Sequence, residues 1–255
     1  MPRYVLDISY LGTEYAGWQI QPNAPTVQEK LEKALSTFLR NPIRVVGAGR
    51  TDTGVHARQL IVHFDWEQPL EARFSNAING LLPHDIALNG VFLANSPKFH
   101  SRFDATSRRY EYNIVLRKTP ELHTTALWVR HSLDVEAMNQ AAGILMEYHD
   151  FASFAKIHHD AKTTFCDVTE AVWQEVSPYH LQFFVRANRF LRGMVRALIG
   201  TQLLIGKGQM SVDAFRQVVE ATDRAAAGPN VSPKGLSLIE VTYPDDSWSE
   251  LEYKS

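Results

Sequence analysis

The order of hydrophobic patterns along this 255-residue chain is the feature that most limits its fold. Segments that alternate apolar and polar residues, as β-strands do, are separated by segments with the three-to-four-residue apolar spacing of amphipathic helices. The first half reads strand, helix, strand, strand, helix, strand. The strands are expected at 4–10, 43–48, 59–66 and 86–94, and the helices at 26–39 and 71–83.

The second half repeats this order with one helix added. Strands are expected at 108–117, 168–176, 180–187 and 236–244, and helices at 134–146, 190–204 and 211–221. The repeat predicts an α+β fold of two ferredoxin-like (βαββαβ) halves, joined into one extended, mainly antiparallel sheet with helices packed on it. We expect the halves to span 1–104 and 105–255. A central cleft between them is the natural place for a site.

Composition indicates an ordinary globular protein, with 45% hydrophobic and 21% charged residues. No apolar run approaches the roughly 18 residues of a membrane-spanning helix, so we expect a cytoplasmic protein. The single cysteine, Cys166, cannot form an internal disulfide, which suits a reducing compartment. Its expected state is a buried, inert thiol.

Arginines cluster in two segments although the net charge is only −2. RFDATSRRY holds Arg102, Arg108 and Arg109, and RANRFLRGMVR holds Arg186, Arg189, Arg192 and Arg196. A helix starting near Asn188 would place Arg192 and Arg196 on one face, as residues four apart. Such paired guanidinium groups suit the capture of phosphate or carboxylate, so a nearly neutral chain can carry a basic cleft.

The segment GAGRTDTGVHA, residues 47–57, combines three glycines with Arg50, Asp52 and His56. Glycines at this density suggest a phosphate-binding loop, but both common phosphate-loop spacings require a glycine where Asp52 stands. A carboxylate facing phosphate would repel it. Asp52 is therefore either the structural residue of a turn or the functional residue that the loop presents.

Taken together, GRTDTGVHA, RRYEY, FLRGMVR and SPKGL occur in an order that resembles the tRNA pseudouridine synthase A family over essentially the whole chain. The resemblance implies isomerisation of uridine to pseudouridine at positions 38 to 40 of the tRNA anticodon stem-loop. It also implies a homodimer, no cofactor and no metal.

The resemblance further implies a role for individual residues. Asp52 would be the catalytic aspartate, Arg50 its neighbour in the loop, and Arg196 its ion-pair partner from the other half. Tyr110 would pack on the target base, with Leu236 as the apolar contact behind it. We expect the remaining substrate contacts from arginines of the basic segments. These are Arg102, Arg189 and Arg192.

The reaction gives these residue types a physical reason. It breaks the bond from C1′ to N1 of uracil, turns the base, and rejoins it through C5. The broken bond leaves positive charge on the sugar, which an ionised carboxylate can stabilise, as in glycosidases. A uridine within a folded stem must flip out, and stacking on an aromatic ring offsets part of that cost. The sequence leaves open whether Asp52 attacks C1′, attacks C6 or removes the C2′ proton.

Two other functions remain open from the residues alone. A metal-dependent hydrolase would use Asp52, His56 and His63, but a second histidine–carboxylate pair at ligand spacing is hard to place, and His158, His159 and Asp160 lie in a polar loop. A non-catalytic RNA-binding module would use a doubled ferredoxin-like sheet, but the aromatic RNP1 pattern of such modules is missing. Two of the named residues also have simpler interpretations. Tyr110 could be a core residue of its strand, and Arg196 could only bind phosphate or cap the sheet.

Overall fold

The computed structural model describes residues 1–156 and 162–251, which contain ten strands and five α-helices. The strand pairs are mainly antiparallel, so the predicted α+β class is confirmed. The contacts divide the chain into two compact units. Unit 1 comprises Met1–Thr106 with the described residues from Leu238 onward, and unit 2 comprises Ser107–Ser237. The domain division that we expect at 104/105 stays a prediction.

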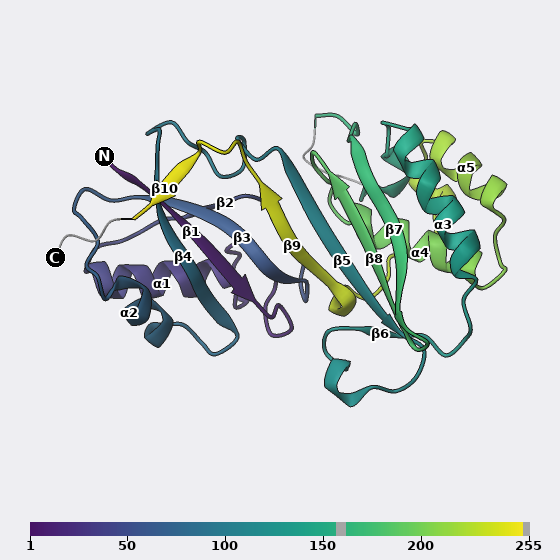
Figure 1. Ribbon diagram of the computed structural model, residues 1–255, viewed down its shortest axis with the longest axis horizontal. Helices are drawn as coiled ribbons and strands as arrows, with labels where there is room; N and C mark the ends of the chain where they lie inside the picture. The colour runs from purple at the N-terminus through teal and green to yellow at the C-terminus, as the bar shows by residue number, and fades with distance from the viewer. Residues whose placement is uncertain (157–161, 252–255) are drawn as a thin grey trace. The chain divides into compact units, whose positions relative to one another are not determined.

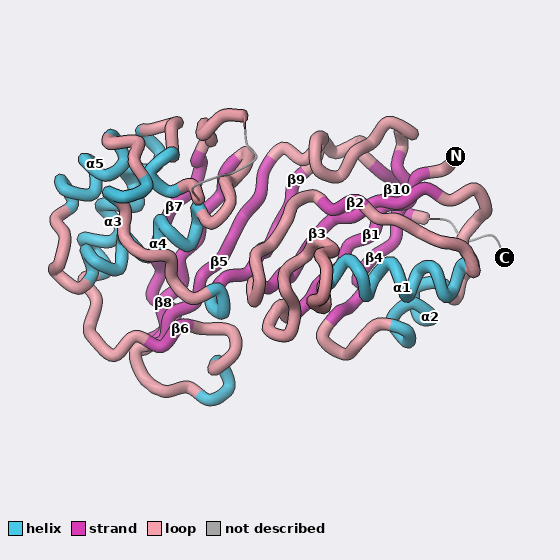
Figure 2. The backbone as a smooth tube through the Cα atoms, turned by 180° about the vertical axis from the view of Figure 1, so that it is seen from behind, coloured by secondary structure: helices cyan, strands magenta, loops and turns pink. Residues whose placement is uncertain are grey.

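Unit 1 has the element order of a ferredoxin-like unit. Its elements are β1 (Arg3–Tyr10), α1 (Val27–Leu39), β2 (Val46–Gly47), β3 (His56–Asp65), α2 (Phe74–Leu81), β4 (Ile86–Ala94), the part of β9 (Leu236–Thr242) from Leu238, and β10 (Trp248–Glu250). Hydrogen-bonded neighbours run in the order β10-β4-β1-β3, and β3 also pairs with β2 and β9. Both helices lie on one face of this sheet (Figures 1 and 2).

Local sequence explains how α1 begins and which face it buries. The hydroxyl of Thr26 accepts a hydrogen bond from the backbone N–H of Glu29 at 3.4 Å, which satisfies one of the unpaired donors of the first turn. Val27, Leu31 and Leu35 are fully buried and form one helical stripe. Packing of this stripe on the sheet fixes the helix, as the apolar spacing predicts.

Unit 2 repeats the arrangement with an extra helix. Its main elements are β5 (Ser107–Val115), β6 (Leu127–Trp128), α3 (Val135–Ile144), β7 (Val168–Ser177), β8 (His180–Ala187), α4 (Met194–Gly206) and α5 (Val212–Glu220). The sheet order is β5-β8-β7, and β6 adds a short parallel pair to β5. The three helices gather beside β7 and β8 (Figure 1).

Polar side chains fasten the helices of unit 2 to β7. The side-chain amide of Asn139 on α3 exchanges two hydrogen bonds with the backbone of Trp173, at 2.7 and 3.0 Å. The indole N–H of Trp173 donates to Oε1 of Gln202 on α4 at 2.6 Å, a fully buried contact. Because an unpaired polar group would be costly at this depth, these bonds fix the orientation of both helices on the sheet.

The structure corrects two sequence predictions and adds two short strands. The expected helix at 190–204 begins only at Met194, because Gly193 has a φ of +73° and therefore interrupts helical geometry. The strand expected at 43–48 is reduced to Val46–Gly47. The short strands β6 and β10 were not expected, since two or three residues give too little alternation to recognise.

Candidate active site

The glycine-rich segment forms the connection between β2 and β3 in unit 1. The backbone N–H of Val55 donates to the carbonyl of Asp52 at 3.1 Å, which closes a β-turn, and Gly54 within it has a φ of +77°. Asp52 is half-buried, whereas its neighbour Thr51 and Val55 are buried. The turn therefore holds the Asp52 backbone between two anchored residues, and Arg50 lies exposed just before it.

A second segment, residues 11–18, packs directly against this turn. The N–H of Trp18 donates to the carbonyl of Thr51, and the N–H of Gly54 donates to the carbonyl of Tyr15, both at 3.2 Å. These two bonds bracket Asp52 on either side. The segment thus acts as a clamp on the backbone that carries the candidate carboxylate.

The clamp requires glycine for steric reasons. A Cβ on Gly12 would lie 2.0 Å from the carbonyl oxygen of Val55, and one on Gly17 would lie 2.5 Å from that of Thr51. By contrast, nothing lies within 4 Å of a Cβ at Gly49. The close approach of residues 11–18 to the turn therefore depends on Gly12 and Gly17, which lie outside the glycine-rich segment 47–57. The sequence alone did not indicate this role.

Buried side chains support the turn from behind. The hydroxyls of Tyr10 and Thr51 are 2.8 Å apart, and Nδ1 of His56 accepts from the backbone N–H of Gly12 at 2.9 Å. The Trp18 ring lies on Tyr10, with ring centroids 6.5 Å apart, and occupies the space where a side chain at Gly47 would be. His56 is thus a hydrogen-bond acceptor within the scaffold of the turn.

In unit 2, Tyr110 projects from β5 and is half-buried. It pairs with Val185 of β8, and its ring meets the ring of Phe190 edge-on, with centroids 5.2 Å apart and an interplanar angle of 87°. Edge contacts of this kind orient an aromatic ring. Phe190 is a positioning neighbour that sequence analysis missed, although it stands within the quoted arginine-rich segment.

Arg196 lies in the first turn of α4 and is tied to the segment before β9. Its Nε donates to the carbonyl of Val231 at 2.7 Å, and its own carbonyl accepts from the N–H of Val231 at 3.2 Å. Gly200 allows this approach, because a Cβ there would lie 1.7 Å from the carbonyl oxygen of Pro229. Two reciprocal bonds to Val231 therefore hold the backbone of Arg196 and the Nε of its guanidinium group.

The segment before β9, which holds Val231, also contacts β5. The hydroxyl of buried Tyr112 donates to the carbonyl of Ser232 at 2.8 Å. Burial raises the pKa of Tyr112, and the positive charge of Arg196 acts against this shift. Leu236, at the start of β9, is 5% exposed. Val231 and Ser232 thus contact Arg196 and Tyr112, respectively, and this segment leads into Leu236.

The expected pairing of Arg192 with Arg196 on one helix face is wrong. Arg192 precedes the left-handed Gly193, is exposed, and uses its carbonyl to accept from the N–H of Lys156 at 3.0 Å. Arg189 is half-buried and lies near the thiol of Cys166, whose pKa burial raises to about 11. Cys166 is buried, as we expected from composition.

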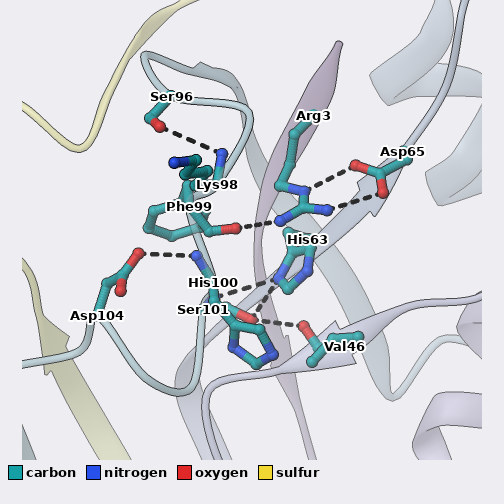
Figure 3. Close-up of polar contacts among 10 residues, drawn as sticks. All are labelled: Arg3, Val46, His63, Asp65, Ser96, Lys98, Phe99, His100, Ser101 and Asp104. Carbon is teal, nitrogen blue, oxygen red and sulfur yellow. Dashed lines mark hydrogen bonds and ion pairs between the residues drawn. The ribbon is translucent and has the colours of Figure 1, made fainter. Parts of the chain in front are cut away.

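Arg102 lies in the segment that follows β4. A cluster of polar contacts next to Arg102 fastens this segment to the sheet of unit 1 (Figure 3). Arg3 holds Asp65 through two bonds of 2.7 and 2.8 Å and also donates to the carbonyl of Phe99. Beyond it, the N–H of Ser101 donates to Nδ1 of His63 at 3.2 Å. The backbone next to Arg102 is thereby fixed, and the Arg102 guanidinium itself lies over the ring of exposed Phe103 at 5.8 Å.

His63 is a structural residue of this cluster. Burial lowers its pKa to about 4, and the nearby charge of Arg3 acts in the same direction. Neutral His63 can therefore accept the Ser101 bond through Nδ1. No group of three or more His, Cys, Asp or Glu side chains that could hold a metal ion occurs among residues 1–156 and 162–251. The histidines of the 158–160 loop lie outside the described residues.

The candidate residues thus divide between the two units. Unit 1 carries Arg50, Asp52 and Arg102. Unit 2 carries the remaining ones, which are Tyr110, Arg189, Arg192, Arg196 and Leu236. The ion pair of Asp52 with Arg196 stays a prediction, as do the individual roles.

Comparison with known proteins identifies the class. The sequence model of the family described as tRNA pseudouridine synthase matches residues 8–104 and 141–244. The chain belongs to this family, whose members are isomerases. Its similarity is to bacterial proteins named tRNA pseudouridine synthase A, and the matches cover nearly all of both chains.

The protein from Parabacteroides distasonis is 46% identical over 96% of this chain and 98% of its own length. That from Bacteroides thetaiotaomicron is 46% identical over 100% and 96%, respectively. That from Porphyromonas gingivalis is 43% identical over 96% and 99%. No helix in the described part of the chain is long and apolar enough to cross a membrane.

Proposed function

We propose that this chain isomerises uridine to pseudouridine at positions 38 to 40 of the tRNA anticodon stem-loop, with Asp52 as the catalytic carboxylate. Membership of the tRNA pseudouridine synthase family supports the reaction. The observation that carries the role of Asp52 is the clamped turn, which fixes this residue between buried Thr51 and Val55. We further propose that the protein works as a cytoplasmic homodimer without a cofactor.

In this proposal Asp52 acts at the sugar. When the bond from C1′ to N1 breaks, electrons leave with the uracil and positive charge develops at C1′. A carboxylate beside C1′ stabilises that charge while the base turns. The bond from C1′ to C5 then forms, C5 loses its proton, and N1 gains one. The uracil leaves as a delocalised anion and stays bound, so a second carboxyl group to protonate a leaving group is not required.

Tyr110 supplies the surface for the flipped base in this proposal. Its half-buried ring is held edge-on by Phe190, so that it is oriented before substrate arrives. Stacking of a base on an aromatic ring contributes roughly 1 to 3 kcal/mol, which offsets much of the few kcal/mol needed for flipping. Leu236 provides the apolar contact behind the base. Arg102, Arg189 and Arg192 contribute positive charge for the RNA backbone, and Arg50 is the catalytic-site neighbour of Asp52 in the loop.

We propose Arg196 as the ion-pair partner of Asp52. The support within unit 2 is that Val231 fixes both the backbone and Nε of Arg196. A guanidinium whose Nε already makes a hydrogen bond loses little further conformational freedom when it pairs with a carboxylate. It is therefore suited to orient the carboxylate of Asp52.

Replacement of Asp52 tests the proposal. The Asp52→Asn variant keeps the size of the side chain and removes the negative charge. We expect no release of tritium from tRNA labelled at C5 of uridine, while tRNA is still bound. Asp213→Asn, on the exposed face of α5, removes the same charge elsewhere and should keep full activity. Sustained tritium release by Asp52→Asn would refute the role of Asp52, and lack of release by the unmodified protein would refute the reaction.

A further inference from the structure

One end of the sheet in unit 2 gathers residues that the proposed reaction does not use. The N–H of Val129 donates to the carbonyl of Val115, and the N–H of Leu116 donates to the carbonyl of Tyr179, both at 2.9 Å. These bonds bring together the end of β5, the short strand β6 and the turn between β7 and β8. Figure 1 shows β6 and its preceding loop at this end of β5.

Three cations lie over two aromatic rings at this end. The guanidinium carbon of Arg117 is 4.5 Å from the ring centroid of Tyr179. Around Trp128, Nζ of Lys118 lies at 5.3 Å and the guanidinium carbon of Arg130 at 4.7 Å from the ring centroid. All three cations are exposed, and Tyr179 is 48% exposed. We call these five residues the cation–ring patch.

The charge of this patch is not neutralised within the described protein. Among residues 1–156 and 162–251, no carboxylate forms an ion pair with Arg117, Lys118 or Arg130. Among the acidic residues nearby in sequence, Glu121 and Glu175 make no ion pair within the described residues, and Asp134 caps α3 by accepting from the N–H of Ala137 at 3.0 Å.

Ring contacts hold the cations differently from carboxylates. A guanidinium or ammonium group over a ring face keeps its N–H donors for another acceptor. By comparison, Arg109 donates two hydrogen bonds to the carboxylate of Glu170, at 2.6 and 2.8 Å, and Arg216 donates two to the carboxylate of Glu147. The patch therefore offers positioned donors and net positive charge, the combination that phosphate groups require.

We propose that the cation–ring patch binds the phosphate backbone of tRNA, as a contact separate from the residues of the proposed reaction. The inference rests on the proposed function for the identity of the RNA. A polyanionic backbone suits the patch because it can face several cations at once and is insensitive to base sequence. The rings then serve to hold the cations in place.

The test is the salt dependence of tRNA binding. The triple variant Arg117→Gln, Lys118→Gln, Arg130→Gln removes the three charges. Affinity falls as salt rises, and each lost phosphate contact reduces the magnitude of the slope of log affinity against log salt by roughly 0.7 to 0.9. We therefore expect the triple variant to bind tRNA more weakly, with a slope whose magnitude is smaller by about 2 to 3. The dissociation constant is measured by filter binding across a series of KCl concentrations.

A charge-matched control separates this patch from general electrostatics. The triple variant Lys33→Gln, Arg40→Gln, Lys207→Gln removes the same charge at exposed positions outside the patch, and we expect it to keep the slope of the unmodified protein. The double variant Arg117→Lys, Arg130→Lys retains the charge and should also keep that slope. An equal loss of slope in the charge-matched control would overturn the proposal.

One further result would overturn it, namely a patch variant, folded by near-ultraviolet circular dichroism, whose slope equals that of the unmodified protein. An altered sedimentation coefficient in that same variant would make the patch an interface between copies of the chain instead. Tritium release by the unmodified protein, measured on the same tRNA, tests the proposed reaction independently of the slope.

Discussion

Replacement of Gly12 by alanine tests whether the clamp on the turn positions Asp52. The added Cβ would lie 2.0 Å from the carbonyl oxygen of Val55, whereas real Cβ atoms essentially never approach within 3.0 Å, so the two backbones must separate by at least about 1 Å. That movement also lengthens the bond from the Gly12 N–H to Nδ1 of His56, now 2.9 Å. The change is therefore transmitted directly to the turn.

The expected cost follows from these two contacts. Overpacking destabilises a protein by about 1 to 3 kcal/mol, and loss of a buried hydrogen bond adds about 1 kcal/mol. A domain with a stability of roughly 5 to 15 kcal/mol stays folded under this load. A displacement of about 1 Å at a catalytic group lowers the rate roughly 100-fold. Gly12→Ala should therefore remain folded and lose activity.

Two measurements are needed, because the change affects both stability and rate. Urea unfolding gives the free energy of unfolding, and single-turnover tritium release from tRNA gives the rate per folded molecule. Gly49→Ala, within the glycine-rich segment, is the matched control, since nothing lies within 4 Å of its Cβ and its φ is not positive. A Gly12→Ala variant that is destabilised as expected, but whose rate stays within twofold of the unmodified protein, would refute the positioning role of the clamp.

Two further predictions concern His63 and Tyr110. The pKa of His63 is lowered from 6.5 to about 4, so above pH 6.5 it is neutral in both the folded and the unfolded chain. Below pH 6.5 only the unfolded chain gains the proton, and this residue should cost about 2 kcal/mol of unfolding free energy between pH 7 and pH 5. Urea unfolding at both values should show a smaller loss for His63→Asn, and an equal loss would contradict the assignment. For Tyr110, replacement by Ala should raise KM for tRNA roughly 5- to 150-fold, the equivalent of 1 to 3 kcal/mol of stacking, while Phe retains the ring and stays near the original value. Equal KM values for the Ala variant and the unmodified protein would remove Tyr110 from the base contact.

Local patterns predicted the elements that are long and amphipathic. The helix after Thr26 and the strand pair of β7 and β8 follow directly from a capping residue and from apolar alternation. The start of α4 did not follow, because the apolar spacing continues through Leu191 while Gly193 adopts a left-handed conformation that precedes the helix. Spacing records which side chains are buried, and it does not record the sign of φ at a glycine.

The candidate site shows the same limit at longer range. Asp52 was recognisable because the residues around it are contiguous in sequence. The clamp was not, since Gly12 and Gly17 acquire their meaning only from carbonyl oxygens about 40 residues away. Val231 and Phe190 are further examples, because each acts on a residue that no local pattern links to it.

The glycines of the motif and those of the clamp therefore have different physical functions. Within the glycine-rich segment 47–57, Gly54 supplies a left-handed turn residue, and Gly47 leaves space for the ring of Trp18. In the clamp, Gly12 and Gly17 permit backbone contact that any side chain would prevent. A carboxylate can be exposed on a mobile loop with motif glycines alone. Its fixed position depends on the second set, which is why Gly12→Ala is expected to reduce the rate while Gly49→Ala is not.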